Sequence, residues 1–291
     1  MRTNNQNKAT TDKEQVSSRS KATTDKEQAS SPKAIVVTGL SKQYPDKTAV
    51  DSISFSVDKG SIFSLLGVNG AGKTTTIKML CGLTRPTGGE AYVLSRSIHT
   101  ELDEVKKLVN ISPQDTSVAS RLTVRENLEF IAGIYGADRK KQREKADEMI
   151  QYFHLQEVAD RRAKVLSGGW QRKLSIAMAL ITEPQIIFLD EPTLGLDVLA
   201  RRELWEVIRR MKEKITIILT THYMEEAESL SDKVAVMVDG QIKAMGSVEE
   251  LKEQTGADNL EEAFVRIAQE TSVRIAQEAF VRIAQEGGAR S

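Results

Sequence analysis

The sequence predicts an α/β fold: a mostly parallel sheet, an antiparallel β segment before it and a helical segment inserted into it. In the second half of the chain, apolar runs such as "QIIFLDE", "ITIILTTH" and "KVAVMVDG" alternate with the helical patterns "ARRELWEVIRRMKE" and "MEEAESL". The apolar runs are continuous, which is typical of parallel strands that are covered on both faces. Earlier, the short strand "SIFSLLG" leads into a glycine-rich loop and the helix "KTTTIKML", which Gly82 is placed to end.

The remaining elements are predicted from local patterns. "AIVVTGLSKQY" and "DSISFSVDKG" alternate apolar and polar residues, which indicates two antiparallel strands at the start of a folded domain expected at 33–255. Over about 101–182 the pattern is helical. There, "TVRE" at Thr123 to Glu126 fits a capping box, and "DRKKQREKADEMIQYF" predicts a long charged helix.

Both ends of the chain contain repeats. "KATTDKEQVSS" at 8–18 returns as "KATTDKEQASS" at 21–31. These segments hold almost no large apolar side chains, so we expect 1–32 to be a disordered polar tail. "VRIAQE" occurs at 265, 273 and 281. A period of eight turns the apolar residues by about 80° per repeat, so we interpret 256–291 as a helical extension lengthened by duplication rather than as a coiled coil.

Composition excludes several classes of function. Forty-one basic residues balance forty-one acidic ones, so no global charge draws the chain to nucleic acid, and we expect no nucleic-acid partner. The single cysteine, Cys81, excludes an intramolecular disulfide and is expected to be buried on a helix. No apolar run reaches the roughly 18 to 20 residues that span a bilayer, and the first residues lack the apolar segment of a secretion signal. We therefore expect a cytoplasmic protein unless a partner holds it at a membrane.

The stretch "GVNGAGKTT" predicts a phosphate-binding loop. It matches the pattern G-x-x-x-x-G-K-[ST] and lies between a predicted strand and a predicted helix, as such a loop must. Its glycines let backbone amides surround phosphate oxygens, the lysine adds a positive charge, and the following threonine hydroxyl suits Mg²⁺. The predicted phosphate-binding residues are Gly67, Asn69, Gly70, Ala71, Gly72, Lys73, Thr74 and Thr75.

Polar side chains follow two of the apolar strands. "IIFLDE" ends in Asp190 and Glu191, and "ITIILTTH" ends in His222, so all three are expected at the carboxyl edge of the sheet, where ligands of parallel sheets bind. Asp190 would hold Mg²⁺ or its water, and Glu191 would activate a water as general base. Taken alone, these residues could equally be solvated strand ends; the phosphate loop favours the catalytic interpretation. Gln114, in the loop "ISPQDTS", carries no signal from spacing alone.

A second anion-binding candidate is the stretch "LSGGWQRK". The residues after it are helical, so Ser167, Gly168 and Gly169 lie at a helix N-terminus, where free amides and the helix dipole attract an anion. Taken alone, the stretch is explained as well by a capped helix start with two glycines. As an anion site it would lack a ligand within this chain, because the loop at 67–75 already accounts for the phosphates of one nucleotide.

Six motifs in order closely resemble the nucleotide-binding subunit of ABC transporters: "GVNGAGKTT", Gln114, "LSGGWQRK", "IIFLDEP", "LGLD" and His222. The resemblance covers roughly 33–250 and implies the ABC ATPase fold, with a P-loop NTPase core. It also implies that two subunits, identical or different, pack head to tail around two ATP molecules with Mg²⁺. Residues that would act on the ATP of their own subunit are Lys73, Thr74, Gln114, Asp190, Glu191 and His222, with Thr74, Gln114 and Asp190 at the metal.

The same resemblance implies roles between subunits. Asp197 of "LGLD" would couple the two sites, and the residues that would act on the neighbour's ATP are Ser167, Gly168, Gly169 and Gln171. Tyr44 matches the aromatic residue that stacks on adenine; a surface tyrosine in a turn is the alternative.

Two positions depart from the usual pattern: Trp170 replaces Gln or Met, and Val68 replaces Pro. Neither change removes a phosphate donor or a metal ligand, so activity is expected. Trp205 is expected to be a helix-packing residue.

Within the family, "DEPTLGLDVLARRELWEVIRRM" and "TTHYMEEAESLSDKVAVMVDGQIKAMGS" look most like the subunits of drug, antibiotic-peptide or sodium exporters. This implies a separate integral-membrane permease that docks near the Gln114 loop and the helical insert and holds the subunit at the inner face of the membrane. A non-transport ABC ATPase in a soluble assembly is the alternative, but this sequence shows neither the long coiled coils nor the second cassette of such relatives. A scaffold without turnover predicts loss of Glu191 or His222, and both are present.

Overall fold

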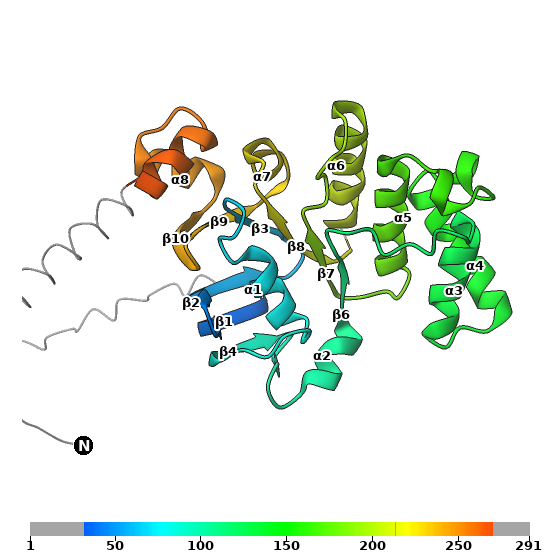
Figure 1. Cartoon of the computed structure of the whole chain (residues 1–291), viewed down its shortest axis with the longest axis horizontal. Helices are drawn as coiled ribbons and strands as arrows, with labels where there is room; N and C mark the ends of the chain where they lie inside the picture. The colour runs from blue at the N-terminus through cyan, green and yellow to red at the C-terminus, as the bar shows by residue number, and fades with distance from the viewer. Residues whose placement is uncertain (1–31, 213, 270–291) are drawn as a thin grey trace, which may run out of the picture. The chain divides into compact units, whose positions relative to one another are not determined.

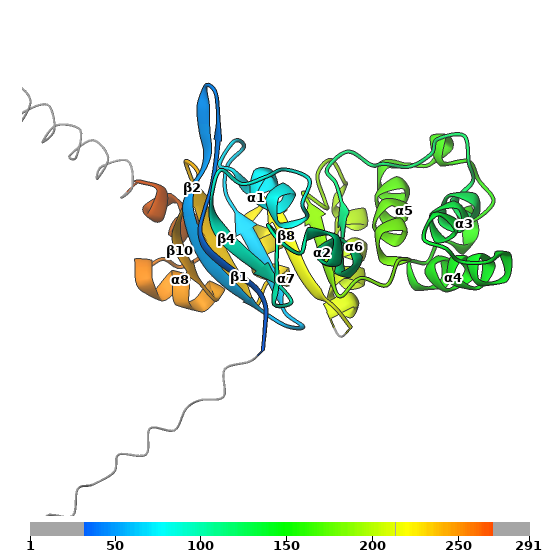
Figure 2. The same ribbon diagram turned by 90° about the horizontal axis from the view of Figure 1, so that it is seen from below.

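The computed structural model describes residues 32–212 and 214–269. Of the polar tail predicted for 1–32, all but Pro32 lies outside the described residues, and so does the part of the predicted extension 256–291 beyond 269. Two sheets and a group of helices make up the described part of the chain (Figures 1 and 2). Among these residues, no helix combines the length and the apolar character needed to cross a membrane.

A six-stranded sheet holds the centre of the fold, in the order β10-β9-β3-β8-β7-β6. Only the β9–β10 pair of this sheet is antiparallel, so the mostly parallel sheet is confirmed. On β7, Ile186 and Phe188 enter one core and Ile187 and Leu189 enter the other, which explains the continuous apolar run. The strands are β3 (Ile62–Leu66), β6 (Val109–Ser112), β7 (Ile186–Asp190), β8 (Thr216–Thr221), β9 (Lys233–Val238) and β10 (Gln241–Gly246).

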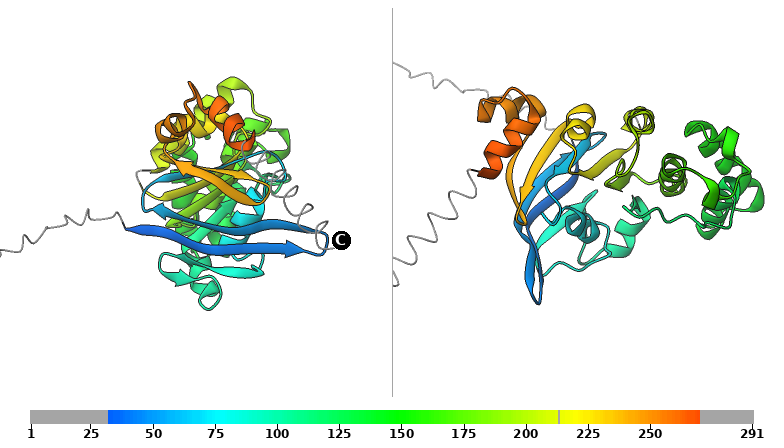
Figure 3. Two further views of the ribbon diagram at one scale, coloured as in Figure 1. Left: turned by 90° about the vertical axis from the view of Figure 1, so that its left-hand side faces the viewer. Right: turned by 45° about the horizontal axis from the view of Figure 1, so that its top comes forward.

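An antiparallel sheet in the order β2-β1-β4-β5 lies beside it, and β10 packs against β2 (Figure 3). The predicted pair β1 (Lys33–Tyr44) and β2 (Lys47–Asp58) is present. Two strands that no sequence pattern predicted, β4 (Gly88–Val93) and β5 (Arg96–Ser97), complete this sheet. The two sheets share a core, in which the ring of Phe55 stacks on that of Phe63 with centroids 5.2 Å apart.

Helix α1 (Lys73–Leu80) packs into the same core through Ile77, Met79 and Leu80. The helix ends at Leu80 with Cys81 as its C-cap, and the backbone of Gly82 then turns left-handed with a φ of 70°, which is common just past the end of a helix. Cys81 is buried, and burial raises the pKa of its thiol.

A helical group is formed by α3 (Val124–Ile134), α4 (Arg139–Tyr152) and α5 (Gly168–Leu180). Its predicted capping box is present: the Glu126 amide donates to Thr123 Oγ1 at 3.1 Å, and the Thr123 amide donates to Glu126 Oε2 at 2.8 Å. Leu128, Phe153 and Leu174 are fully buried in the core of this group.

The interval 101–182 is not helical throughout. It begins with α2 (Leu102–Leu108) and then contributes β6, which pairs in parallel with β7 at the edge of the central sheet. The sequence "VNIS" is too short to show a strand pattern of its own, so the pairing with β7 decides its structure. The short 3₁₀ turns Gln156–Val158 and Ala163–Val165 lead from α4 to α5.

The remaining helices are α6 (Val198–Lys212), α7 (Met224–Leu230) and α8 (Val248–Thr255). A further helical segment, 260–269, continues to the last described residue. Leu251, Leu260 and Phe264 bury this part of the chain in a third core with Val234 and Val236 of β9.

The register of the central strands sets the position of the candidate site. Leu66 pairs with Thr221, and Asp190 pairs with Thr220, so β3, β7 and β8 end level with one another. The phosphate loop, Glu191 and His222, which come directly after these three strands, are therefore brought to one edge, as expected for a parallel sheet.

Candidate functional site

The backbone between β3 and α1 forms a tight cradle. A Cβ on Gly67 would lie 2.3 Å from the Met237 carbonyl oxygen. Gly72 has a φ of 103°, and a Cβ there would lie 2.4 Å from the Ala49 carbonyl oxygen, so this turn requires glycine. Because Gly72 is the N-cap of α1 and offers no capping side chain, the first amides of α1 are left for a ligand, and the helix dipole favours an anion.

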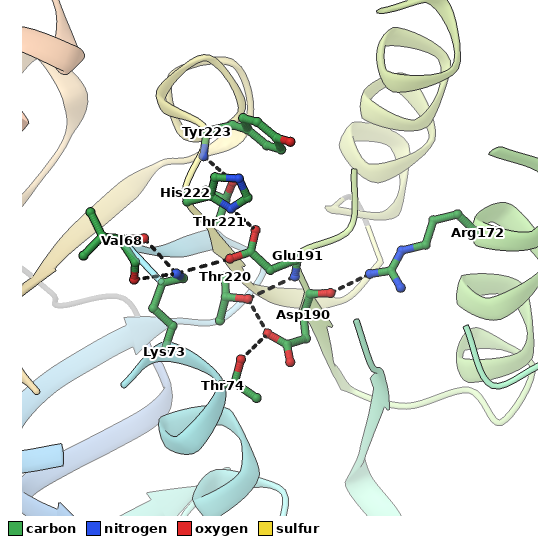
Figure 4. A network of polar contacts seen from close by, with 11 residues as sticks. Val68, Lys73, Thr74, Arg172, Asp190, Glu191, Thr220, Thr221, His222 and Tyr223 are labelled. Atoms are coloured by element: carbon green, nitrogen blue, oxygen red, sulfur yellow. Dashed lines mark hydrogen bonds and ion pairs between the residues drawn. The ribbon is translucent and has the colours of Figure 1, made fainter. Parts of the chain in front are cut away.

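Lys73 supplies a buried positive charge at this cradle. Its ammonium donates to the carbonyl oxygens of Gly67 at 2.7 Å and Val68 at 3.2 Å. The same nitrogen lies 3.2 Å from Glu191 Oε1 (Figure 4). The lysine is only 5% exposed.

Asp190, at the end of β7, gathers two hydroxyl groups. Thr220 Oγ1 donates to Asp190 Oδ1 at 2.6 Å, and Thr74 Oγ1 donates to the same oxygen at 2.9 Å (Figure 4). The hydroxyl of Thr74 and the carboxylate of Asp190 are hard oxygen donors, which is the chemistry that Mg²⁺ prefers. The residues present therefore fit a magnesium ion bound beside a phosphate.

Glu191 lies between a lysine and a histidine. Its Oε2 is 2.7 Å from His222 Nδ1, while Oε1 faces Lys73. The residue is 5% exposed and has a φ of 47°, a left-handed conformation that is uncommon for a residue with a side chain. The Glu191 amide donates to Thr220 Oγ1 at 3.0 Å, which anchors this conformation. Strain of this kind is frequent where a side chain must be aimed at a ligand.

A cavity of about 360 Å³ opens in front of these groups. It brings together nine of the predicted residues: Asn69, Gly70, Gly72, Lys73, Thr74, Thr75, Gln114, Glu191 and His222. The structure also places Lys47, Ala49 and Leu194 in its wall, which no sequence pattern predicted. The mixture of cations, amides and a carboxylate suits a phosphorylated ligand together with a water to be activated.

Tyr44 is not among the residues that line this cavity. It is 43% exposed at the end of β1, where it pairs with Lys47, and the Lys42 ammonium lies 5.0 Å from its ring centre. Its ring is thus available on the surface three residues from the cavity wall, and adenine stacking stays a prediction.

The residues of "SGG" do not line the cavity either. Ser167 is the N-cap of α5 but makes no side-chain cap, so the first amides of α5 have no capping group from it. In Figure 1, β6 and β7 lie between α1 and α5, and Figure 2 likewise shows α5 well apart from α1. Gln171 turns into its own loop, where its amide nitrogen donates to the carbonyl oxygens of Ala163 and Leu166 at 3.2 and 3.1 Å.

Two residues singled out in the sequence have structural contacts at α6. Asp197 Oδ1 accepts from the amides of Leu199 at 3.0 Å and Ala200 at 2.9 Å, so it caps this helix. Trp205 is buried, and its indole nitrogen donates to Glu226 Oε1 at 3.3 Å.

Trp170, the unusual residue of "LSGGWQRK", has its ring 4.8 Å from the ammonium of Lys173. That ammonium also pairs with Glu203 Oε2 at 2.7 Å. The tryptophan therefore covers a lysine that joins α5 to α6.

Comparison with known proteins agrees with this geometry. Residues 50–194 match the family model described as ABC transporter. The chain is 40% identical over 229 residues to the daunorubicin/doxorubicin resistance ATP-binding protein DrrA of Streptomyces peucetius, covering 78% of this chain and 69% of that protein. It is 39% identical over 237 residues to the probable multidrug ABC transporter ATP-binding protein YbhF of Escherichia coli, covering 79% of this chain. Only 41% of the Escherichia coli protein is spanned, so the chain matches less than half of that relative's length.

Among solved structures, the ATP-binding subunit of an ABC transporter superposes with a TM-score of 0.71 at 29% identity, covering 80% of this chain and 99% of that one. The sheets, the helical group and the phosphate cradle thus define an ATP-binding cassette. The chain belongs to the ABC transporter family, as its extended identity to the Streptomyces relative shows.

Proposed function

We propose that two subunits, either two copies of this chain or this chain and a similar one, close head to tail around two ATP molecules and hydrolyse them. The observation that carries the proposal is the position of Glu191, which reaches Lys73 with one carboxylate oxygen and His222 with the other at the wall of the cavity. We assign this activity to 33–255, with the helical group α3–α5, which lies within the interval 101–182, as the part that moves in closure.

Phosphate binding would change the contacts of Lys73. The ammonium now has three acceptors, namely two carbonyl oxygens and Glu191. Phosphate oxygens in the cavity compete with these acceptors, because a phosphate carries more charge than a carbonyl. When Lys73 turns to the phosphates, Glu191 Oε1 becomes free to accept a proton from a water. ATP binding therefore frees the general base, Glu191, that acts in its hydrolysis.

Hydrolysis then requires positioning more than covalent chemistry. Glu191 orients the water, whose oxygen attacks the γ-phosphorus while the bond to the bridging oxygen of ADP breaks. His222 holds Glu191 Oε2 and lines the same cavity as Gln114, which supports a contact between His222 and the γ-phosphate. Mg²⁺, held by Thr74 and Asp190 with Gln114 near it, would neutralise charge on the β- and γ-phosphates.

The amides of Ser167, Gly168 and Gly169 supply the other half of each site. They stand at the start of α5, outside the cavity of their own chain. In the head-to-tail pair they would bind the γ-phosphate of the neighbour's ATP and exclude water from it. Turnover thereby depends on closure, which is the motion that a transporter needs.

We further propose that the subunit powers a separate membrane permease at the inner face of the membrane and that the cargo is a drug, an antibiotic peptide or an ion. The names of the Streptomyces and Escherichia coli relatives support drug export. Phe130, Ile134 and Tyr135 support docking at the helical group, since they expose 56%, 61% and 64% of their surface along α3 and at its end.

The Glu191→Gln variant tests the catalytic proposal. We expect ATP to drive the variant into a dimer that sediments at twice the monomer mass, with turnover reduced about 10²- to 10⁴-fold, because the general base is lost while phosphate binding remains. Glu104→Gln, at an exposed pair on α2, is the matched control and should retain the parent rate. A Glu191→Gln chain that stays monomeric in ATP and turns over normally would contradict the proposal.

A further inference from the structure

Arg172 is a buried cation on α5 that has no part in the function proposed above. It is 4% exposed and lies five positions after Ser167. Its nearest hydrogen-bond partners are not carboxylates. Nε donates to the Pro192 carbonyl at 2.9 Å, Nη2 donates to the Asp190 carbonyl at 2.7 Å, and Nη1 donates to the carbonyls of Pro113 and Gln114.

Such an arrangement is specific to arginine. A guanidinium presents five donors in a rigid plane, so one side chain can serve four carbonyl oxygens that belong to separate segments of backbone. A lysine ammonium has three donors at one point and could reach only some of them. Burial lowers the pKa of Arg172 to about 10, although the nearby charges of Asp190, Glu226 and Glu191 raise it in part. The guanidinium therefore remains charged at neutral pH.

The four carbonyl oxygens all belong to segments that carry the cavity's reactive groups. Gln114 lines the cavity with its side chain while its carbonyl accepts from Arg172. Asp190 accepts from Thr74 through its carboxylate and from Arg172 through its carbonyl (Figure 4). Glu191 stands between two residues, Asp190 and Pro192, whose carbonyls Arg172 holds.

The start of α5 carries Ser167, whose segment would bind the neighbour's ATP in the proposed pair. Arg172 and the N-cap Ser167 belong to the same helix and lie a little more than one turn apart, and a rigid helical element of this kind can carry coupling between two sites. The first turn of α5 also packs closely on α6, since a Cβ on Gly169 would lie 3.1 Å from Ala200 Cβ. A displacement at Arg172 is therefore carried to the start of α5.

We propose that Arg172 is a positioning residue that couples the chain's own phosphate cavity to the Ser167 segment used by the neighbour's ATP. The inference rests on the head-to-tail pair proposed above. When phosphates draw Lys73 away from Glu191, the backbone at 190–192 and 113–114 adjusts, and the guanidinium passes this adjustment to α5. Each subunit thus presents its Ser-Gly-Gly segment correctly once its own cavity is filled.

The test compares Arg172→Met and Arg172→Lys with Arg125→Met, a control in which an arginine of α3 loses an exposed pair with Asp147. The first readout is association of full-length chains that keep Glu191, driven by a non-hydrolysable ATP analogue and measured by sedimentation. We expect Arg172→Met to bind ATP nearly as well as its parent and to lose at least about tenfold in association, Arg172→Lys to be intermediate, and Arg125→Met to match the parent.

The second readout is hydrogen exchange in monomers, using Ser167→Arg to prevent closure. We expect ATP to alter exchange at the first turn of α5 in Ser167→Arg and not in Ser167→Arg/Arg172→Met. A merely structural role would lower stability and leave this response in place, so an exchange response that Arg172→Met does not change would overturn the inference, whether or not association is weakened. If Arg172→Met does not fold, the Lys variant decides by the same two readouts.

The two proposals fail differently. If the Glu191→Gln chain does not associate in ATP, the shared site is wrong, and the exchange response still decides whether Arg172 couples the cavity to α5.

Discussion

Replacing Lys73 with Met tests the buried cluster around Glu191 in the nucleotide-free protein. The side chains of Lys73 and Glu191 are 5% and 6% exposed and 3.2 Å apart. Removing one partner of a buried pair leaves an uncompensated charge, which costs about 3–5 kcal/mol of unfolding free energy. After Lys73→Met, Glu191 keeps His222 as its one side-chain partner among the contacts described. We therefore expect a loss of about 3 kcal/mol, the lower end of that range.

Replacing the other partner, Glu191, with Gln should lower the unfolding free energy by less. After Glu191→Gln, Lys73 still donates to two carbonyl oxygens, at 2.7 and 3.2 Å, so we expect a loss of about 1–2 kcal/mol, comparable to one charged hydrogen bond. The double variant should lose less than the sum of the two, because it leaves neither charge unpaired.

Urea denaturation without nucleotide, followed by tryptophan fluorescence, measures all three free energies. Equal losses for the two single variants, or strict additivity in the double variant, would refute the contact between Lys73 and Glu191 as the resting arrangement. The same three chains should also differ in ATP affinity, which Lys73→Met lowers and Glu191→Gln leaves nearly intact.

Three further predictions concern single positions. Burial raises the pKa of Glu226 above its usual 4.5, so the folded state holds the proton more tightly than the unfolded state, and stability should fall as pH rises from about 4.5 through the folded pKa. Glu226→Gln should remove that part of the slope in thermal melts; an unchanged slope would contradict it. Gly60 has a φ of 69° and open space around it, so Gly60→Ala should lower the unfolding free energy by about 1–2 kcal/mol through backbone strain alone. Gly72→Ala would also place a Cβ 2.4 Å from the Ala49 carbonyl oxygen, so it should lower the unfolding free energy further and weaken ATP binding. Equal losses in the two alanine variants would show that the cradle can relax. Asp197→Ala should cost about 1 kcal/mol as a lost cap of α6, and Asp197→Asn, which can still cap the helix, should recover most of that loss in the same melts.

Much of the fold could be predicted because its central strands have distinctive sequences. β3, β7 and β8 are buried at every residue, so each appears as a mostly continuous apolar run, and each is followed by a polar motif. β5 and β6 have two and four residues, and β4 begins with two glycines, so their strand structure comes from pairing with neighbours rather than from local pattern.

Some residues of the candidate site could likewise be predicted from the sequence, and others could not. Lys73 could be predicted from the glycine-rich motif that contains it. Asp190, Glu191 and His222 could be predicted because a parallel sheet brings the carboxyl ends of its strands to one edge. Lys47 and Leu194 reach the cavity from other segments through tertiary packing, and no spacing in the sequence marks them. Arg172 could not be found, since its partners are backbone carbonyls, which every residue carries.

Mixing two inactive variants tests the central claim most directly. Glu191→Gln removes the proposed general base from one subunit but keeps its Ser-Gly-Gly segment, and Ser167→Arg blocks that segment but keeps the cavity intact. In a head-to-tail pair of the two, the cavity of the Ser167→Arg chain faces the intact segment of the Glu191→Gln chain.

Each variant alone should be nearly inactive. Their equimolar mixture should recover up to about a quarter of the parent ATPase rate, because half of random pairs are mixed and each holds one complete site. A mixture that is no more active than its components, or a Ser167→Arg chain that turns over normally by itself, would contradict the shared site.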